Sequence, residues 1–305
     1  FIRELLDSYK ITGDKSFLVK AEYLTEYVLD GWDCTIDESN KERGGITWGP
    51  GYVSKHSCSN GPMVSPLVWL HEIYQGDDDT ITHYFIDKND RVSRRERTMK
   101  KSDYYLMFAR KIYDWQKECL LREDGVYDDM MGGCIPKNPE VELIKGVEYR
   151  KGILCSNKVG PAISYNSGTM LSGAADLYRA TGEVTCKNDA LILSDASFSF
   201  FARNSAEIPG YYSYKIDGFN NWFNGVLMRG YADCHQLYGK VRDYIYTFQQ
   251  NLDYAHDHYM YNGFLPTNLL KGWNSDPEKN NIEGMFSFSF AAEYAVISRL
   301  MLSDK

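Results

Sequence analysis

The sequence predicts an all-α fold built from repeated helical hairpins. Nine segments carry apolar residues at the spacing of one helix face, whereas strand signals are few and short. One pattern returns several times along the chain, namely a helix, a short turn containing Gly and Asp, and a second helix. Because stacked hairpins bury faces that a single hairpin leaves exposed, this repetition favours a closed α/α toroid over a helical bundle.

The hairpin turns locate the expected helices. Gly13, Gly76 and Gly182 each follow a helical stretch, and glycine readily adopts the left-handed conformation that ends a helix. The sequence Asn60-Gly61-Pro62 is a good helix start, with Asn as the cap and Pro in the first turn. In chain order, the expected helices span 2–10, 17–29, 62–74, 104–120, 167–179, 189–202, 223–237, 241–257 and 284–302.

Two stretches lack a helical pattern. Residues 133–163 contain three prolines and several glycines, which predicts a long loop, and loops of that length in compact domains usually carry a function or are disordered. The basic run from Arg91 to Lys101 falls between two expected helices. We expect it to be a solvated loop, with contact to an acidic or phosphorylated glycan as the alternative.

Composition excludes several classes of protein. At 305 residues the chain has room for one large domain or two smaller ones, and its net charge of −8 argues against a nucleic-acid partner. No stretch approaches the roughly 18 uninterrupted apolar residues of a membrane span. Seven cysteines leave at least one thiol unpaired in a monomer, and none has a zinc-type spacing, so we expect no metal. No Walker loop or GxGxxG motif occurs, and we expect no cofactor.

The most informative stretch runs from Ser164 to Glu183. Its apolar residues fall on one helix face, while Tyr165, Asn166 and Gly168 stand at the start of that helix, where polar side chains can face a ligand. The stretch resembles the signature of glycoside hydrolase family 76, the bacterial and fungal α-1,6-mannanases. In that family Tyr-Asn-Gln-Gly opens the helix, and Ser167 replaces the Gln here.

Further fragments match the family in the same order. Thr47 and Asn224 depart from the family pattern, where a Trp and a Lys stand. The matching fragments are Gly44-Gly45-Ile46-Thr47-Trp48, then Lys55 with Ser59 and Asn60, then Gly125-Val126-Tyr127-Asp128, and Phe223-Asn224-Gly225 with Arg229. Each fragment is weakly specific alone, but their shared order is hard to obtain by chance.

The resemblance implies an (α/α)6 barrel of twelve helices. Residues 1–305 would then form a single catalytic domain that is incomplete at its N-terminus. In the family, an adjacent Asp-Asp pair precedes the helix that matches Phe1 to Leu6, and it supplies the nucleophile and the general acid/base of a retaining glycosidase. We therefore expect the catalytic pair just upstream of Phe1.

Inside the chain, the adjacent residues Asp128 and Asp129 are the alternative candidates for the catalytic pair. Retaining chemistry needs two carboxyl groups about 5–5.5 Å apart, and an irregular loop could turn both side chains inward. The alternatives are a sugar-binding carboxylate at Asp128 and a turn-forming pair. The expected substrate-binding residues are Trp48, Lys55, Asn60, Asp128, Tyr165, Asn166, Asn224 and Trp273. Each could instead serve packing or helix capping.

By resemblance, the function is that of a retaining endo-α-1,6-mannanase that acts on α-mannan or mannooligosaccharides. It would be a monomer that is secreted, periplasmic or attached to the cell surface. One rival is another α/α-toroid sugar enzyme, of the unsaturated glucuronyl hydrolase or epimerase type. An epimerase needs histidines in its cavity, for which only His56 and His71 lie near the motifs. The other rival is a mannan-binding protein without catalysis.

Overall fold

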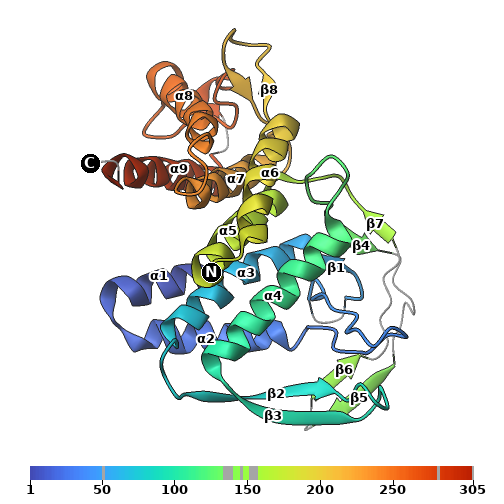
Figure 1. Ribbon diagram of the computed structural model, residues 1–305. Coiled ribbons are helices and arrows are strands. Elements are labelled where there is room, and N and C mark those ends of the chain that lie inside the picture. Colours follow the sequence, from blue (N-terminus) through green and yellow to red (C-terminus); the bar gives the residue numbers. More distant parts are fainter. Residues whose placement is uncertain (50–51, 133–139, 145–146, 151–156, 280–281, 304–305) are drawn as a thin grey trace. The chain divides into compact units, whose positions relative to one another are not determined.

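A computed structural model describes residues 1–49, 52–132, 140–144, 147–150, 157–279 and 282–303 (Figure 1). All nine predicted helices are confirmed within these ranges. They are α1 Ile2–Thr12, α2 Lys15–Leu29, α3 Ser57–Ile73, α4 Lys101–Leu120, α5 Ser164–Thr181, α6 Val184–Phe201, α7 Asn220–Cys234, α8 Val241–Tyr259 and α9 Gly284–Ser303. A short 3₁₀ helix covers Pro277–Lys279.

The chain folds into two compact units. Unit 1 comprises residues 1–122, 127–162 and 176–182, and unit 2 comprises residues 123–126, 163–175 and 183–305. Unit 1 therefore contains α1 to α4 and the last residues of α5, and unit 2 contains the first part of α5 and the remaining helices.

In unit 1, α1 and α2 form the first hairpin and α3 packs along α4. Gly13 ends α1 at φ 71°, and Asp14 caps α2 by accepting a hydrogen bond from the Ser16 amide at 2.8 Å. The core between α3 and α4 includes fully buried Leu67, Leu70, Tyr105 and Ile112. The turn chemistry of the sequence thus gives the hairpin that its periodicity predicts.

Helix α3 begins at Ser57, five residues before the predicted start. The Ser57 amide donates to the Asp129 carbonyl at 2.8 Å, and its hydroxyl donates to the Asp128 carbonyl at 2.6 Å. These long-range bonds pair the amide and the hydroxyl of Ser57 at the buried N-terminal end of the helix, so the start is set by tertiary contacts rather than by a local cap. Pro62 consequently lies inside the helix.

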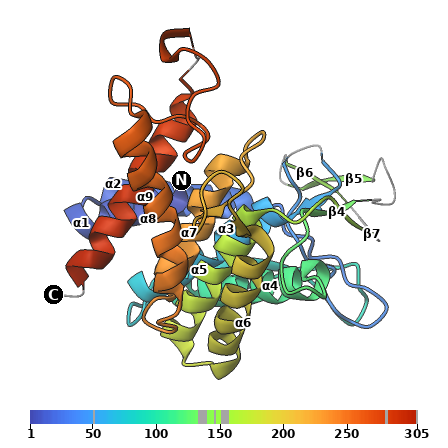
Figure 2. The ribbon, with the colours of Figure 1, turned by 90° about the horizontal axis from the view of Figure 1, so that it is seen from above.

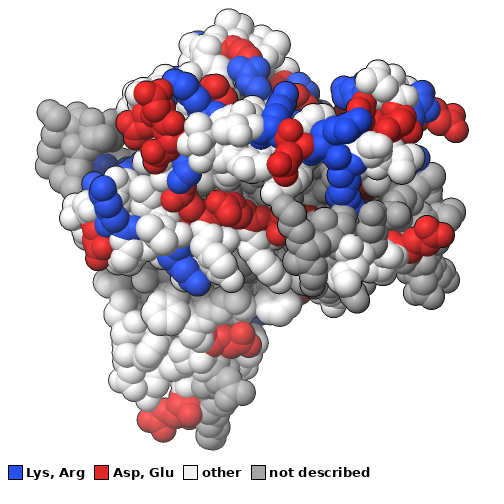
Figure 3. Space-filling view, turned by 90° about the horizontal axis from the view of Figure 1, so that it is seen from below, with Lys and Arg blue, Asp and Glu red and all other residues white. Residues whose placement is uncertain are grey.

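The basic run is a strand, so the prediction of a loop there is wrong. β2 (Thr80–Ile86) and β3 (Arg94–Lys100) form an antiparallel hairpin that contacts α4. Most β3 side chains stay exposed, as expected for charged groups, because a two-stranded ribbon pairs its backbone while its side chains remain hydrated. Acidic and basic side chains are interspersed on one face of the molecule (Figure 3).

Strands also occupy part of the segment 133–163, where a loop was predicted. β5 (Val141–Ile144) pairs with β6 (Val147–Arg150), and a three-stranded sheet has the order β1-β4-β7. Its strands are β1 Lys55–His56, β4 Met130–Gly132 and β7 Asn157–Val159. The prediction of a loop is therefore wrong for β5, β6 and β7, which fall within 133–163. Pro136 and Pro139 lie outside the described residues.

In unit 2, α7 packs against both α8 and α9, which also contact each other (Figure 2). A short hairpin joins β8 (Arg203–Asn204) to β9 (Tyr212–Ser213). Gly168 of α5 and Gly230 of α7 lie together: a Cβ built on Gly230 would be 2.5 Å from the Gly168 carbonyl, and one on Gly168 would be 2.7 Å from the Leu227 amide. These two helix backbones can touch only because both positions lack a side chain.

The described cysteines have free thiols. Cys186 and Cys234 are buried, and Cys34, Cys58 and Cys119 are half-buried. The other two cysteines lie outside the described residues. None of the described helices is both long and apolar enough to cross a membrane.

Candidate functional site

The predicted site residues fall into both units. Unit 1 holds Trp48, Lys55, Asn60, Asp128 and Asp129, and unit 2 holds Tyr165, Asn166, Asn224 and Trp273. The two groups are described in turn.

The loop 44–48 in unit 1 is fixed by side chains on either side of it. The Asn60 amide group accepts from the Ile46 amide at 2.8 Å and donates to the Ile46 carbonyl at 3.0 Å. Lys55 Nζ donates to Asp33 Oδ2 at 2.7 Å and to the Gly44 carbonyl at 2.6 Å. Both side chains are almost fully buried, so their polar atoms hold the loop in one conformation.

The same loop presents Trp48 to solvent. The Trp48 side chain is 53% exposed, and its ring stacks on the His56 ring, with 5.1 Å between centroids and 18° between planes. Tyr52 approaches it edge-on at 4.7 Å, and Ser54 Oγ lies 2.8 Å from His56 Nε2. An exposed indole on a fixed support is a flat apolar surface against which a sugar ring can stack.

The carboxyl groups of Asp128 and Asp129 have different surroundings. Asp128 is buried and accepts from an Arg122 guanidinium nitrogen at 3.1 Å. Burial raises the pKa of Asp129 above its ordinary value, and nearby His56 opposes this effect. Burial also lowers the pKa of His56, opposed by Asp129. The pairing of β1 with β4 brings Asp129 close to the His56–Trp48 stack. Whether the pair is catalytic, sugar-binding or structural stays a prediction.

The second histidine considered for an epimerase has a structural contact. His71 is buried in α3, and its Nδ1 lies 3.0 Å from the Ser102 carbonyl. Among the described residues, no group of three His, Cys, Asp or Glu side chains could hold a metal ion.

In unit 2, Tyr165 and Asn166 stand in the first turn of α5, as the sequence predicts. The half-buried Tyr165 ring packs against Trp222 at 5.5 Å and Phe223 at 5.6 Å. Asn166 is almost fully buried. Trp222 and Phe223 at the start of α7 therefore hold the Tyr165 ring at the start of α5.

Asn224 and Trp273 fasten loops to the helices of unit 2. Asn224 Oδ1 accepts from Ser164 Oγ at 2.9 Å, and its Nδ2 donates to the Lys215 carbonyl at 2.8 Å. Trp273 is half-buried, and its Nε1 donates to the Tyr259 carbonyl at 2.7 Å. Their roles in binding substrate stay predictions.

A cavity of about 260 Å³ in unit 2 was not foreseen from the sequence. Asn224 lines it together with Asn221, Phe248, Asn251, Phe290 and Glu293. Burial raises the pKa of Glu293 to about 8, although a hydrogen bond from Ser289 Oγ, 3.3 Å from Oε1, opposes the shift. The single glutamate in the mainly apolar helix α9 is the sequence signal that could have located this cavity.

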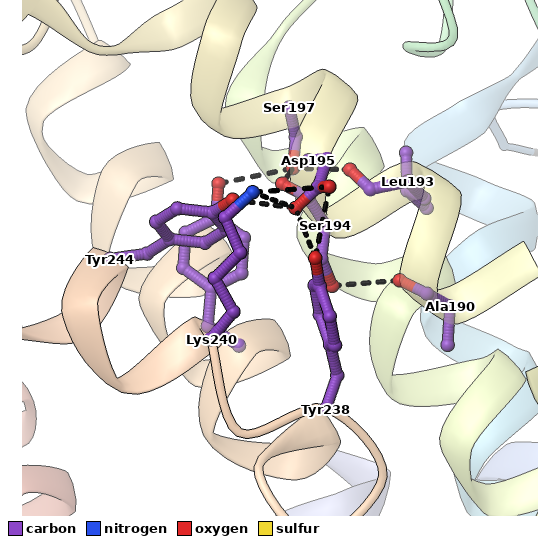
Figure 4. Close-up of polar contacts among 9 residues, drawn as sticks. Ala190, Leu193, Ser194, Asp195, Ser197, Tyr238, Lys240 and Tyr244 are labelled. Carbon is purple, nitrogen blue, oxygen red and sulfur yellow. Dashed lines mark hydrogen bonds and ion pairs between the residues drawn. The ribbon is translucent and has the colours of Figure 1, made fainter.

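Asp195 lies in a second polar cluster, in which its carboxylate oxygens are paired with neighbouring side chains. Asp195 of α6 accepts from Tyr244 at 2.5 Å, from Tyr238 at 2.9 Å and from Lys240 at 3.3 Å (Figure 4). Burial raises the pKa of Asp195, but these three donors outweigh burial and hold it below its ordinary value. Because its oxygens serve neighbouring side chains, this carboxylate ties α6 to the start of α8.

Solved structures with a similar fold span nearly the whole chain. A glycoside hydrolase family 76 mannosidase from Bacteroides thetaiotaomicron matches with a TM-score of 0.73 and 21% identity, covering 100% of this chain and 70% of that one. An inactive α-1,6-mannanase variant from Salegentibacter sp. HEL1_6, in complex with α-1,6-mannotetrose, matches with a TM-score of 0.64 and 22% identity, covering 96% and 72%. Dfg5 from Chaetomium thermophilum, in complex with glucosamine, matches at 0.57 and 16%, covering 91% and 60%.

These likenesses confirm the predicted all-α fold of the (α/α)6-barrel class. No curated protein matches the chain. The family model described as glycosyl hydrolase family 76 matches residues 94–305, which is more than half of the sequence. The chain therefore belongs to glycosyl hydrolase family 76.

Proposed function

We propose that the protein is a retaining endo-α-1,6-mannanase. The match of residues 94–305 to the family carries this proposal. It is supported by the fold shared with an α-1,6-mannanase whose structure holds α-1,6-mannotetrose. The exposed Trp48 ring supplies a surface of the kind that a mannose unit can stack on.

We place the catalytic carboxyl pair immediately before Phe1. The inactive Salegentibacter variant has two adjacent aspartates replaced, which fits a pair of neighbouring aspartates as the reacting groups. In a retaining glycosidase one carboxyl of such a pair is ionised as the nucleophile, while the other keeps its proton as the acid.

In this mechanism the nucleophile attacks the anomeric carbon while the acid protonates the leaving oxygen. Water then hydrolyses the glycosyl-enzyme, with the second carboxyl now acting as a base. Asp128 of unit 1, and Tyr165 and Asn166 of unit 2, are proposed as residues that contact substrate. Trp48 and Trp273 would bind units further along the glycan, where stacking contributes affinity without discriminating strongly between hydroxyl patterns.

The test uses the chain extended upstream through the Asp-Asp pair. Release of reducing ends from α-1,6-mannan should be lost when either aspartate of that pair is changed to Asn. The matched in-chain variants Asp128→Asn and Asp129→Asn should retain measurable turnover. Activity that survives the upstream changes and vanishes with Asp129→Asn would move the catalytic pair into the chain and contradict the placement.

The same preparation separates hydrolysis from binding alone. If folded protein binds mannooligosaccharides but releases no reducing ends, the protein is a mannan-binding member of the family and the hydrolase proposal fails. Product sizes distinguish endo from exo action, since an endo enzyme releases a ladder of oligosaccharides early in the reaction.

A further inference from the structure

The cavity in unit 2 has the features of a binding site built for a small neutral ligand. It lies among α7, α8 and α9 and is closed by residues of the connections before α7 and before α9. Its volume of about 260 Å³ is slightly below the roughly 300–1,000 Å³ typical of pockets for drug-sized ligands, which limits an occupant to a small molecule.

One wall of the cavity is apolar and aromatic. Phe248 of α8 and Phe290 of α9 are both buried and both line it, together with Leu270. Tyr214 stacks on Phe248 with 4.2 Å between ring centroids and 25° between planes, which fixes the orientation of the Phe248 ring. The cavity therefore offers a rigid apolar face rather than a mobile one.

Two buried polar side chains also line the cavity, and they call for polar partners in a ligand. Asn251 is 6% exposed, and its Nδ2 donates to the Tyr212 carbonyl at 2.8 Å, but its Oδ1 has no hydrogen-bond partner among the described residues. Glu293 is 5% exposed, and its Oε1 accepts a hydrogen bond from Ser289 Oγ at 3.3 Å. Buried polar atoms are normally paired, so this arrangement is incomplete without a further polar partner.

The lining excludes other ligand classes. Among the described residues that line it there is no lysine, arginine or histidine, so an anion would meet no counter-charge. The lining carries two glutamates, Glu207 and Glu293, and no described group of three His, Cys, Asp or Glu side chains could hold a metal ion. A purely apolar ligand would leave Asn251 Oδ1 unpaired. A ligand with hydroxyl groups and an apolar face would pair the buried polar atoms and also cover the aromatic side chains.

We propose that this cavity binds one neutral, pyranose-sized sugar unit through Asn251, Glu293 and the aromatic wall. Hydroxyls of the sugar donate to Asn251 Oδ1, while the Glu293 carboxyl donates to a sugar oxygen and Phe248 and Phe290 cover the ring's apolar face. Glu293 can act as a donor because burial keeps its carboxyl protonated at neutral pH. The site goes beyond the proposed hydrolysis, and only the choice of mannose as the probe rests on it.

The experiment measures binding of methyl α-D-mannopyranoside to the full chain by ligand-observed NMR, with calorimetric titration for the affinity. Ala206 is exposed and lines the cavity, so Ala206→Trp obstructs the site without disturbing the core. Ala291→Trp makes the same change at an exposed position of α9 that does not line the cavity. We expect saturable binding that is weakened at least tenfold by Ala206→Trp and changed less than about twofold by Ala291→Trp.

Two further variants test the polar contacts. Glu293→Gln keeps a hydrogen-bond donor of similar shape and should bind within a few-fold of the parent protein, whereas Glu293→Leu should lose binding. Thermal unfolding of each variant establishes that it is folded. The proposal is overturned if no saturable binding is seen, or if Ala206→Trp binds as well as Ala291→Trp.

This result is independent of catalysis. If the protein cleaves mannan but does not bind the monosaccharide, the proposed sugar site is refuted and the hydrolase proposal stands. If the protein binds the monosaccharide, Ala206→Trp blocks that binding and mannan is left intact, the sugar site is supported and only the hydrolase proposal is refuted.

Discussion

The buried carboxyl of Glu293 should make the stability of the protein fall as pH rises. Its pKa is raised from 4.5 to about 8 because the side chain is buried without a cation beside it in the cavity lining. The folded state therefore holds this proton more tightly than the unfolded state. The contribution to stability is fully present below pH 4.5 and is lost as pH rises through 8.

The magnitude follows from the two pKa values. At about 1.4 kcal/mol for each pKa unit, the interval between 4.5 and about 8 corresponds to roughly 5 kcal/mol, of which about 4 kcal/mol is lost between pH 5 and pH 9. Glu293→Gln removes the titration but keeps the side chain's shape. At roughly 2 °C for each kcal/mol, the variant should gain about 8 °C in Tm over the parent protein between pH 5 and pH 9.

Differential scanning calorimetry of both proteins across this pH range is the assay, and the quantity compared is the difference in Tm. The neighbouring Tyr214 and Tyr294 do not confuse the result, because burial raises the pKa of both, that of Tyr294 to about 12. Glu207→Gln, the same change on the exposed rim, is the matched control. A Tm difference between parent and Glu293→Gln that stays constant from pH 5 to pH 9 would refute the reasoning.

Three other changes test the packing and the charge contacts. Gly168→Ala places a Cβ against the backbone of α7 and should cost about 2–4 kcal/mol in urea unfolding. Gly239→Ala, where a Cβ meets nothing within 4 Å, should cost under about 1 kcal/mol. Lys55→Met leaves the Asp33 carboxylate buried without its cation and should cost about 3–5 kcal/mol, with Lys55→Arg retaining more stability. Asp195→Asn weakens three hydrogen bonds to a partly exposed carboxylate and should lower stability by about 1–2 kcal/mol, and an unchanged Tm would show that this cluster is not a structural tie.

Helices were predictable from the sequence because their pattern is local. The spacing of apolar residues and the glycines of the turns depend only on neighbouring positions, and both located the nine helices. The start of α3 was misplaced because Ser57 is held by carbonyls of residues 128 and 129, more than 70 positions away. The β2–β3 hairpin was missed because charged side chains concealed a pairing that involves mainly the backbone.

The site was predictable in part. The motifs pointed to the loop 44–48 and to the start of α5, but they did not predict which groups hydrogen-bond to Lys55 and Asn60. Those partners are residues 11 to 22 positions away that become neighbours only through folding. The cavity at Glu293 stayed hidden for the same reason, because its walls come from α7, α8, α9 and two connections.

In the loop 44–48, the residues that restrain the backbone are different from the residue that faces solvent, Trp48. Gly44 and Gly45 have φ values of 67° and 81°, and side chains at either position would collide with Trp115. Since the backbone is already restrained, a glycan that stacks on Trp48 has little loop entropy to remove when it binds. Under the proposed stacking role of Trp48, a change at residue 48 would alter glycan preference while the residues that restrain the loop, and with them the stability of the fold, remain unchanged.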